Sequence, residues 1–531
     1  MQHEGTLHMK RRTFLATAAM AGLAAPAVGQ QSRALRFVPQ GNLPALDPVW
    51  TTAIVVRNHA FLIWDTLYGV GEDLVAKPQM VAGHETSADG LRWTLTLRPD
   101  LKFHDGEQVR SADCIPSIVR WGRRNGFGQQ LLAQLDEMRV IDDRRFEIRL
   151  KSPFAHLPYA LGAEACFIMP ERMAKTDPFQ QITEYVGSGP YRFLRDEWVS
   201  GVRAAYARFD GYAPRPEPAS FLAGGKVAHF DRVEWVIMPD PAIAGSALQT
   251  GEVDWIEQPL SDLLPRLRQS RGVEVDTKVD LLGSIGVIRF NHLHPPFDNP
   301  KLRRALLPAI DQADFLVAIM GDERELVRTG VGVFPIGTPL ANDAGLSVLT
   351  GPRDVEEARR LVRESGYKGE KVVLLSPSDF PVVQAMAQVT RDLYERVGLN
   401  VEYVSADWGT VITRRNSREP VERGGWSTFL TYGGGMTFAN PASYTALRGN
   451  GPNAWFGWPT SPKLEDLRAA WYRAPDLEAE RTLAREIQTT VWDEVPFIPI
   501  GQWYQPIARR ADITGIPRGA YPLFWNVRRT G

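Results

Sequence analysis

The sequence predicts an α/β protein with more than one domain, and three observations support that prediction. Its 531 residues are too many for one hydrophobic core, so two or three domains are expected. Residues 354–430 alternate helical patterns with short apolar runs, which is typical of βα units around a sheet. Residues 93–97 and 146–150 alternate apolar and polar side chains, which indicates half-buried strands.

The elements are predicted in chain order from these patterns. Strands are expected at 36–38, 93–97, 138–141, 146–150, 191–193, 202–206, 232–237 and 253–256, and helices at 55–67 and 242–250. Further along, helices are expected at 354–366, 382–397, 410–418, 462–473 and 478–493, and strands at 371–375, 399–404, 426–430 and from 497. Gly251 and Gly398 directly follow predicted helices, where glycine accepts the left-handed conformation that ends a helix.

Composition and motifs exclude several classes of function. A formal net charge of −1 leaves no basic field, so we expect no nucleic-acid partner. The sequence contains neither a Walker A loop nor an H-E-x-x-H zinc motif. Ser365 and Lys368 match S-x-x-K only formally, because Gly366 would end the helix that this motif needs. His104 and Asp105 are interpreted as turn residues, so we expect no catalytic residues and no enzyme.

Two further pairs of residues leave alternatives open. His292 and His294 would face the same way in a strand and could share a metal ion. Two prolines follow directly and would end such a strand, so a solvated loop is favoured and we expect no metal or other cofactor. Cys114 and Cys166 could pair in an oxidising compartment, or remain two separate buried thiols.

The N-terminus has the features of an export signal. Arg11 and Arg12 precede an apolar run over 14–28 that is too short to span a bilayer comfortably. Residues 1–29 are therefore interpreted as a twin-arginine-like signal peptide, with Met9 as an alternative start. No cysteine lies near the expected cleavage point. We therefore expect a periplasmic protein that is not a lipoprotein.

Several strings occur in an order that is typical of one family. The longest runs over 93–113 and combines a strand, a Pro-Asp break, a Phe-His-Asp-Gly turn and a helix start. Further matches are Leu-Asp-Pro at 46–48, Gly-Ser-Gly-Pro-Tyr at 187–191, the segment 290–305 and Asn-Pro at 440–441. Together these strings resemble the extracytoplasmic solute-binding proteins of family 5, the peptide/nickel type that serves ABC importers.

This resemblance implies a two-lobed periplasmic-binding-protein fold of type II, cluster C, with an extra subdomain inserted in lobe I. Lobe I would comprise 30–60, 186–290 and 500–531, the inserted subdomain 61–185, and lobe II 291–499. Crossovers near 289–292 and 496–501 would form the hinge. Closure about such a hinge is a known way to enclose a ligand.

The resemblance also implies a function. The protein would be the periplasmic substrate-binding component of an ABC importer, capturing a short peptide or peptide-like solute between its lobes. It would deliver this ligand to an inner-membrane ABC permease with its ATPase, and we expect it to act as a monomer. Two alternatives remain: a carrier of nickel, haem or an opine-type small molecule on the same fold, and an extracytoplasmic hydrolase.

The segment expected to contact ligand is rich in aromatic side chains around 433–435, which is expected to be a flexible loop. Ligand cavities are mostly apolar and aromatic, and Asn440 can both donate and accept hydrogen bonds. The predicted ligand-binding residues are Asp407, Trp408, Trp426, Tyr432, Phe438 and Asn440. For Trp408 and Trp426, ordinary packing in the core of lobe II is the alternative.

The charge pattern of this segment bears on the ligand. In peptide-binding relatives an acidic residue here typically meets the α-amine of the peptide, but no Asp or Glu occurs over 424–463. A cationic group could instead meet aromatic faces or Asp407. Arg414 or Arg415 could bind a ligand carboxylate as a bidentate fork, and a solvated helix face is the alternative.

Overall fold

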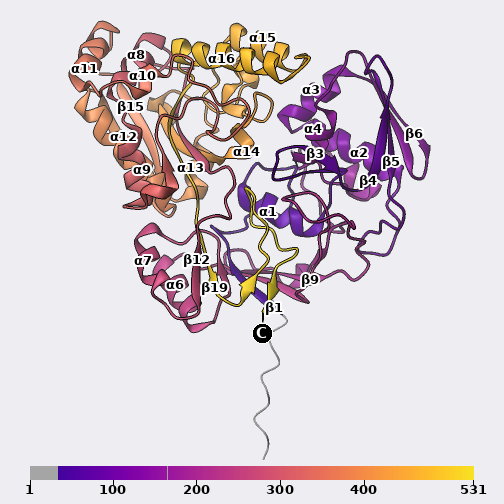
Figure 1. Ribbon diagram of the computed structural model, residues 1–531. Helices are drawn as coiled ribbons and strands as arrows, with labels where there is room; N and C mark the ends of the chain where they lie inside the picture. The colour runs from indigo at the N-terminus through magenta and orange to yellow at the C-terminus, as the bar shows by residue number, and fades with distance from the viewer. Residues whose placement is uncertain (1–33, 164, 531) are drawn as a thin grey trace, which may run out of the picture.

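The computed structural model describes residues 34–163 and 165–530, so the predicted signal peptide lies outside the described residues. Within this part of the chain the strands form three large sheets and two short ribbons. Figure 1 places lobe I at the bottom, the inserted subdomain at the right and lobe II at the upper left. No helix of the described residues is long and apolar enough to cross a membrane.

Lobe I is built on a seven-stranded sheet of order β12-β19-β11-β1-β10-β9-β8. Its strands are β1 (Ala34–Val38), β8 (Tyr191–Phe193), β9 (Arg203–Arg208), β10 (Arg232–Val236), β11 (Trp255–Ile256), β12 (Val273–Asp276) and β19 (Ile507–Arg510). β1 lies between β10 and β11 and runs parallel to both. Phe37 packs edge-on against Trp255, and with Trp235 these buried rings fill the core against α1 (Ile54–Ile63).

The other face of this sheet packs against α6 (Pro241–Thr250) and α7 (Leu264–Arg268) through Val38, Ile256 and Ala508. Gly251 ends α6 with a φ of 79°, as the glycine pattern predicted. Helix α1 is shorter than the expected 55–67, because Trp64 is extended and leads into the ribbon of β2 (Tyr68–Val70) and β3 (Ala76–Pro78).

The inserted subdomain has a four-stranded antiparallel sheet of order β4-β5-β7-β6. Its elements are β4 (Val81–Thr86), β5 (Arg92–Leu97), β6 (Leu135–Asp142), β7 (Arg145–Leu150), α2 (Ser111–Gly122), α3 (Gly126–Gln134), α4 (Leu157–Ala163) and α5 (Glu171–Ala174). Trp93, Leu95 and Leu97 alternate with more exposed residues along β5, as expected for a half-buried strand. Cys114 and Cys166 are both free and buried, so they are two separate thiols rather than a disulfide.

Lobe II has a six-stranded sheet of order β14-β18-β13-β17-β15-β16. The strands are β13 (Ser284–Phe290), β14 (Val327–Arg328), β15 (Lys371–Pro377), β16 (Asn400–Ala406), β17 (Thr428–Gly434) and β18 (Phe497–Trp503). The helices are α8 (Pro300–Ala305), α9 (Gln312–Met320), α10 (Ser347–Thr350), α11 (Val355–Glu364), α12 (Pro381–Arg396), α13 (Trp408–Arg414), α14 (Gly435–Phe438), α15 (Pro462–Trp471) and α16 (Leu477–Glu494).

Strand β15 shows why this sheet is buried on both faces. Val372 and Leu374 join the core on the side of α12, whereas Val373 and Leu375 pack with Val411 of α13 on the other side. A continuous apolar run is the pattern expected for a strand covered on both faces. The short ribbon of β20 (Ile513–Thr514) and β21 (Arg528–Arg529) closes the C-terminal segment against lobe I.

The crossovers lie elsewhere than at 289–292 and 496–501. β13 pairs with β17 and β18 in the sheet of lobe II, so the chain crosses over 277–283 and over 504–506. Asp280 joins the two crossovers, because its carboxylate accepts backbone N–H bonds from Leu282, Gly283 and Gln505 at 3.2, 2.9 and 3.0 Å. The first crossover was predicted too late in the chain. The family string at 290–305, on which that prediction rested, begins only after β13 has paired with β17 in the sheet of lobe II.

Candidate functional site

The carboxyl ends of three strands meet at one edge of the lobe II sheet. β15 runs parallel to both β16 and β17. Phe380 and Trp408 follow the first two strands, and Tyr432 lies near the end of the third. The Phe380 ring lies 5.2 Å from Trp408 and 5.8 Å from Tyr432, centroid to centroid. In open α/β sheets this edge is where ligands bind.

Lobe I presents the corresponding edge of its own sheet. β1 and β11 are parallel, and Gln40 and Gln258 follow their carboxyl ends. Gln258 Nε2 donates to Gln40 Oε1 at 2.8 Å. The Tyr432 hydroxyl of lobe II lies 3.4 Å from the Oε1 atoms of both glutamines. Burial raises the pKa of Tyr432, so its hydroxyl stays protonated and donates across the lobe interface.

Glu257 lies directly beside this contact. Its Oε1 accepts a bond from Nδ2 of Asn58 on α1 at 3.1 Å, and its Oε2 accepts one from the backbone N–H of Gln40 at 2.7 Å. The side chain is 6% exposed, and burial raises its pKa to about 7 although both hydrogen bonds lower it. The strand predicted at 253–256 ends one residue before Glu257, and no local pattern indicated that this side chain faces lobe II.

Three of the predicted residues lie around α13 and the start of β17. Asp407 is exposed and caps α13, accepting the backbone N–H of Thr410 at 3.0 Å. Trp408 is half-buried at the carboxyl edge of the sheet. Trp426 is buried, and its Nε1 donates to the carbonyls of Arg415 and Ser417 at 3.1 and 3.2 Å. Trp426 is therefore packed in the core of lobe II, which was the alternative to ligand contact for this residue.

Phe438 and Asn440 lie in the interior of lobe II. The Phe438 ring stacks on Tyr444 at 4.2 Å, and Asn440 Oδ1 accepts backbone N–H bonds from Ala442 and Ser443, each at 3.0 Å. Of the six predicted residues, the structure therefore brings Asp407, Trp408 and Tyr432 to the carboxyl edge, with Asp407 engaged in capping α13. Direct contact with ligand stays a prediction for all six.

The segment 433–435 is not a separate loop. Gly433 belongs to β17, whereas Gly435 begins α14. A Cβ on Gly433 would lie 2.8 Å from the Phe438 ring, and one on Gly435 would overlap Leu282 at the crossover. Close packing, rather than loop freedom, therefore requires glycine at these two positions.

The two arginines of α13 have different surroundings. Arg414 Nε donates to the carbonyl of Gly424 at 3.1 Å, and its role is local. The guanidinium of Arg415 lies 4.4 Å from the Phe456 ring centroid and 5.9 Å from that of Trp408. Burial lowers the pKa of Arg415 to about 10, so it remains charged at neutral pH. Its Nε is buried without a hydrogen-bond partner among the described residues.

His104, His292 and His294 each contact backbone groups of the protein. His104 Nδ1 accepts the backbone N–H of Gly187 at 3.1 Å, and its Nε2 donates to the Gly189 carbonyl at 3.0 Å. This turn therefore ties the 93–113 string to the glycine-rich crossing. His292 and His294 contact different carbonyls, those of Pro496 and Arg418. Among the described residues, no three His, Cys, Asp or Glu side chains are grouped to hold a metal ion.

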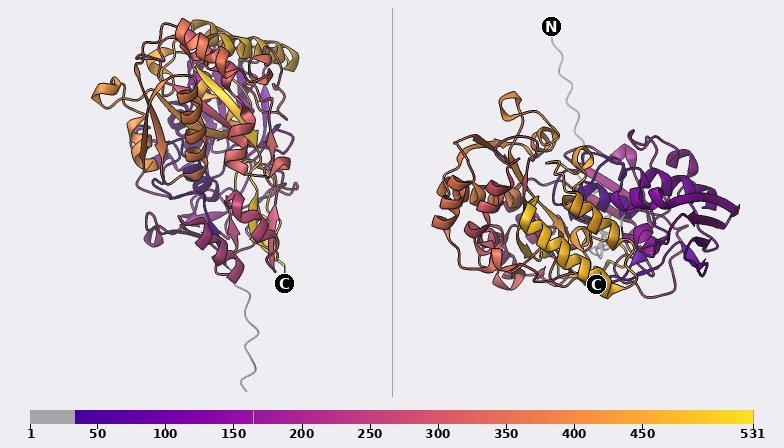
Figure 2. Two further views of the ribbon diagram at one scale, coloured as in Figure 1. Left: turned by 90° about the vertical axis from the view of Figure 1, so that its left-hand side faces the viewer. Right: turned by 90° about the horizontal axis from the view of Figure 1, so that it is seen from above.

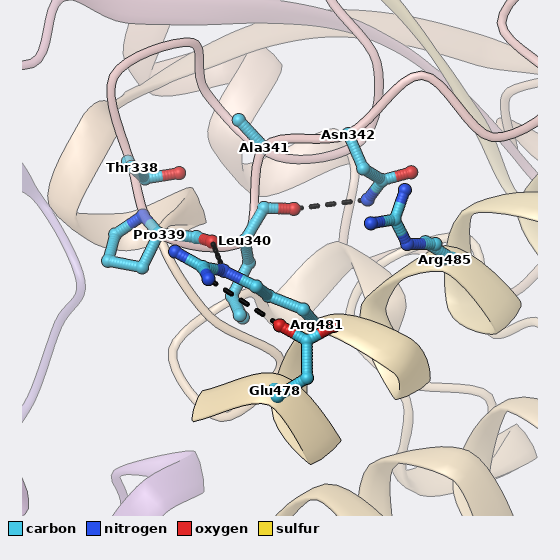
Figure 3. A pocket seen from close by; sticks show the side chains of 8 residues that line it. All are labelled: Thr338, Pro339, Leu340, Ala341, Asn342, Glu478, Arg481 and Arg485. Carbon is cyan, nitrogen blue, oxygen red and sulfur yellow. Dashed lines mark hydrogen bonds and ion pairs between the residues drawn. The ribbon is translucent and has the colours of Figure 1, made fainter. Parts of the chain in front are cut away.

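Lobe II also has a hollow of about 350 Å³ between the loop 338–342 and α16 (Figure 3). Arg481 reaches across it and donates to the Pro339 carbonyl at 3.2 Å, and it lies 3.6 Å from Glu478. None of the six predicted ligand-binding residues lines this hollow.

Two lobes on separate sheets, joined by two crossovers, define the class of two-lobed periplasmic binding proteins. Residues 75–455 match the family described as bacterial extracellular solute-binding proteins, family 5 Middle, and the chain belongs to this family. A probable peptide ABC transporter periplasmic-binding protein from Sinorhizobium fredii is 38% identical over 493 residues, covering 92% of each chain. A glutathione-binding protein from Pectobacterium atrosepticum is 26% identical over 508 residues, also covering 92% of each chain.

A solved structure supports the same fold. The dipeptide-binding protein from Pseudoalteromonas sp. in complex with Met-Leu matches with a TM-score of 0.79 at 20% identity, covering 94% of this chain and 100% of that chain. The protein is thus the periplasmic substrate-binding component of an ABC transporter, and it is not an enzyme.

Proposed function

We propose that this protein captures a short peptide or peptide-like solute between its lobes and delivers it to an inner-membrane ABC permease with its ATPase. The observation that carries the proposal is the meeting of two carboxyl edges, with Tyr432 of lobe II reaching Gln40 and Gln258 of lobe I. The name of the relative from Sinorhizobium fredii, a probable peptide-binding protein, supports a peptide cargo.

The side chains at this interface have the chemistry that a peptide needs. Glutamine amides both donate and accept hydrogen bonds, as a peptide backbone does. Phe380, Trp408 and Tyr432 offer apolar faces for side chains. Arg415 adds an unpaired guanidinium Nε beside Trp408 that suits a carboxylate. We therefore assign ligand contact to Gln40, Gln258, Trp408 and Tyr432. For Asp407, Trp426, Phe438 and Asn440 ligand contact stays a prediction, and the last three pack inside lobe II.

Native mass spectrometry of the protein from its own periplasm tests the cargo. We expect one or more bound masses that dissociate on denaturation and fragment as short peptides. A haem, an opine or a nickel complex as the retained mass would replace the peptide proposal by the corresponding carrier. The same spectrum reports whether the protein is a monomer, as we propose.

We further propose export by the twin-arginine route without a lipid anchor. Replacing both Arg11 and Arg12 by lysine should abolish export by that route, whereas an ordinary secretory signal would tolerate the exchange. Periplasmic fractionation of wild type and variant measures this. Export that persists in the variant would contradict the proposed route, and acylation of the mature protein would contradict the absence of an anchor.

A further inference from the structure

We propose that Glu257 and Asn58 form a subsite in lobe I for a cationic group of the ligand, the α-ammonium when the ligand is a peptide. This inference rests on the proposed function, because it names the chemistry that the interface recognises. Glu257 follows β11 and Asn58 belongs to α1, so both are held on regular elements of lobe I. Gln40, which also contacts Tyr432, links the subsite to the lobe interface.

The carboxylate of Glu257 is buried without a cation. It takes part in no ion pair among the described residues, and its two hydrogen-bond donors are a neutral amide and a backbone N–H. Tyr432 is the titratable group that faces it from lobe II, and this phenol is neutral. A buried carboxylate costs free energy unless a cation pairs with it. The two oxygens can together accept about four hydrogen bonds, so two positions remain for a ligand.

Asn58 supplies a second, independent indication of a missing donor. Its side chain is 1% exposed, and its Oδ1 has no hydrogen-bond partner. The unpaired oxygen belongs to the same amide whose Nδ2 bonds to the carboxylate of Glu257. Buried polar atoms in folded proteins are nearly always hydrogen-bonded. An ammonium group, with three donors and no acceptor, would satisfy both side chains at once.

The segment of lobe II that contains Tyr432 supplies no carboxylate. Residues 424–463 contain neither Asp nor Glu. At position 435, three residues after Tyr432, any side chain would overlap Leu282, so an acidic residue is sterically excluded there. Asp379 and Asp407 at the carboxyl edge of lobe II each accept a backbone N–H, from Trp408 at 2.7 Å and from Thr410 at 3.0 Å. We therefore place the charge complementarity to a cationic ligand at the facing edge of lobe I, where Glu257 is buried.

The test compares free-amine ligands with ligands that lack the charge. Wild type, Glu257→Gln and Asn58→Ala are freed of bound ligand and titrated by calorimetry with a defined dipeptide library and with the same library N-acetylated. Glu252→Gln is the matched control, because Glu252 is an exposed carboxylate on the segment that leads into β11. Thermal melting of each variant verifies that it folds.

We expect wild type and Glu252→Gln to bind the free-amine library at least tenfold more tightly than the acetylated one. Glu257→Gln should lose this preference while its affinity for acetylated peptides stays within twofold, and Asn58→Ala should lose part of it. In wild type, binding near pH 6.5 should release a proton, because a bound ammonium lowers the pKa of Glu257.

Three results would overturn the inference, and they differ in whether the proposed peptide capture also fails. If Glu257→Gln keeps the tenfold preference, or if wild type binds both libraries equally, the subsite is wrong while peptide capture stands. If wild type binds neither library, the proposed function fails together with the subsite. Should Glu257→Gln fail to fold, the preference of Asn58→Ala decides between these outcomes.

Discussion

Two of the contacts that lobe II makes with the rest of the molecule differ chemically. At the carboxyl edges, Tyr432 meets Gln40 and Gln258 through hydrogen bonds, beside the buried carboxylate of Glu257. At the other contact, the inserted subdomain meets α15 and α16 through aromatic rings. Figure 2, in the view from above, shows these two helices on the side of lobe II that faces the subdomain.

The aromatic contact is tightly packed. The His156 ring lies 4.3 Å from Trp471 with an interplanar angle of 6°, and Phe154 stacks on Tyr472 at 6.0 Å. His156 Nε2 also lies 3.8 Å from a carboxylate oxygen of Glu480. Burial lowers the pKa of His156 to about 4, so at neutral pH its ring is uncharged and the contact with Glu480 is not an ion pair. Stacking and apolar area hold this contact together.

We infer from this difference that the aromatic contact serves the stability of the fold and the polar contact serves recognition of the ligand. The rings of the aromatic contact stack on one another within the chain, so their packing can hold lobe II against the subdomain with or without a ligand. The polar contact leaves Asn58 Oδ1 without a hydrogen-bond donor and the buried Glu257 carboxylate without a cation, so a ligand that supplies both completes it. Substitutions in the first region should change the free energy of unfolding, and substitutions in the second should change affinity and its dependence on ligand charge.

The largest expected effect is on the aromatic side. Trp471→Ala should lower the free energy of unfolding by about 3–5 kcal/mol, because a buried indole leaves a cavity between α15 and the subdomain. Urea unfolding of the ligand-free protein measures this. Phe179→Ala is the control, since Phe179 is 61% exposed and its loss should cost within about 0.5 kcal/mol. Equal losses for the two variants would contradict a structural role for the aromatic contact.

Glu257 should make the stability of the ligand-free protein depend on pH. Its pKa is raised from an ordinary value of 4.5 to about 7, so the folded state binds this proton more tightly than the unfolded state. Its contribution is fully present below pH 4.5 and is lost as the pH rises through 7. The loss amounts to about 3 kcal/mol.

Unfolding of wild type and Glu257→Gln at pH 5 and pH 8.5 tests this dependence. The variant lacks the titrating group, so its stability relative to wild type should rise by about 3 kcal/mol between the two pH values. A difference that does not change with pH would mean that Glu257 is not a buried, uncompensated carboxyl group.

A smaller effect is expected for the hydroxyl that crosses the interface. Tyr432→Phe keeps the ring contacts with Phe380 and Trp503 but removes the donor to Gln40 and Gln258. Ligand affinity should fall about fivefold, corresponding to about 1 kcal/mol, with little change in unfolding. Calorimetric titration with the dipeptide library measures the affinity. A loss of stability without a loss of affinity would place Tyr432 with the aromatic contact instead.

The smallest effect concerns an exposed ion pair between the lobes. Arg268 of α7 contacts the Glu323 carboxylate, which follows α9, at 2.6 and 2.8 Å. The two side chains are 41% and 17% exposed, so a double-mutant cycle should give about 0.5 kcal/mol, weakened by salt. A coupling above about 2 kcal/mol would show that this pair contributes far more to the contact between the lobes than an exposed ion pair is expected to.

Local patterns predicted most elements, and they failed where distant packing decides. The alternation along β5 and the glycine after α6 were sufficient, because both depend on neighbours in the sequence. The prediction for 433–435 was wrong because glycines there serve close packing against Phe438 and Leu282 rather than chain freedom. The crossover positions were displaced because strand pairing partners lie more than one hundred residues away.

By itself the sequence determined the α/β class, the family strings and the scarcity of acidic residues around Tyr432, since each is a property of composition or local order. Only the tertiary structure decided which of the predicted residues reach the carboxyl edge, where it placed Trp408 and Tyr432 and packed Trp426 into the core. It also decided which carboxylate faces lobe II. Glu257 lies 175 residues before Tyr432 in the chain, and only the crossing of the chain between two sheets brings them together.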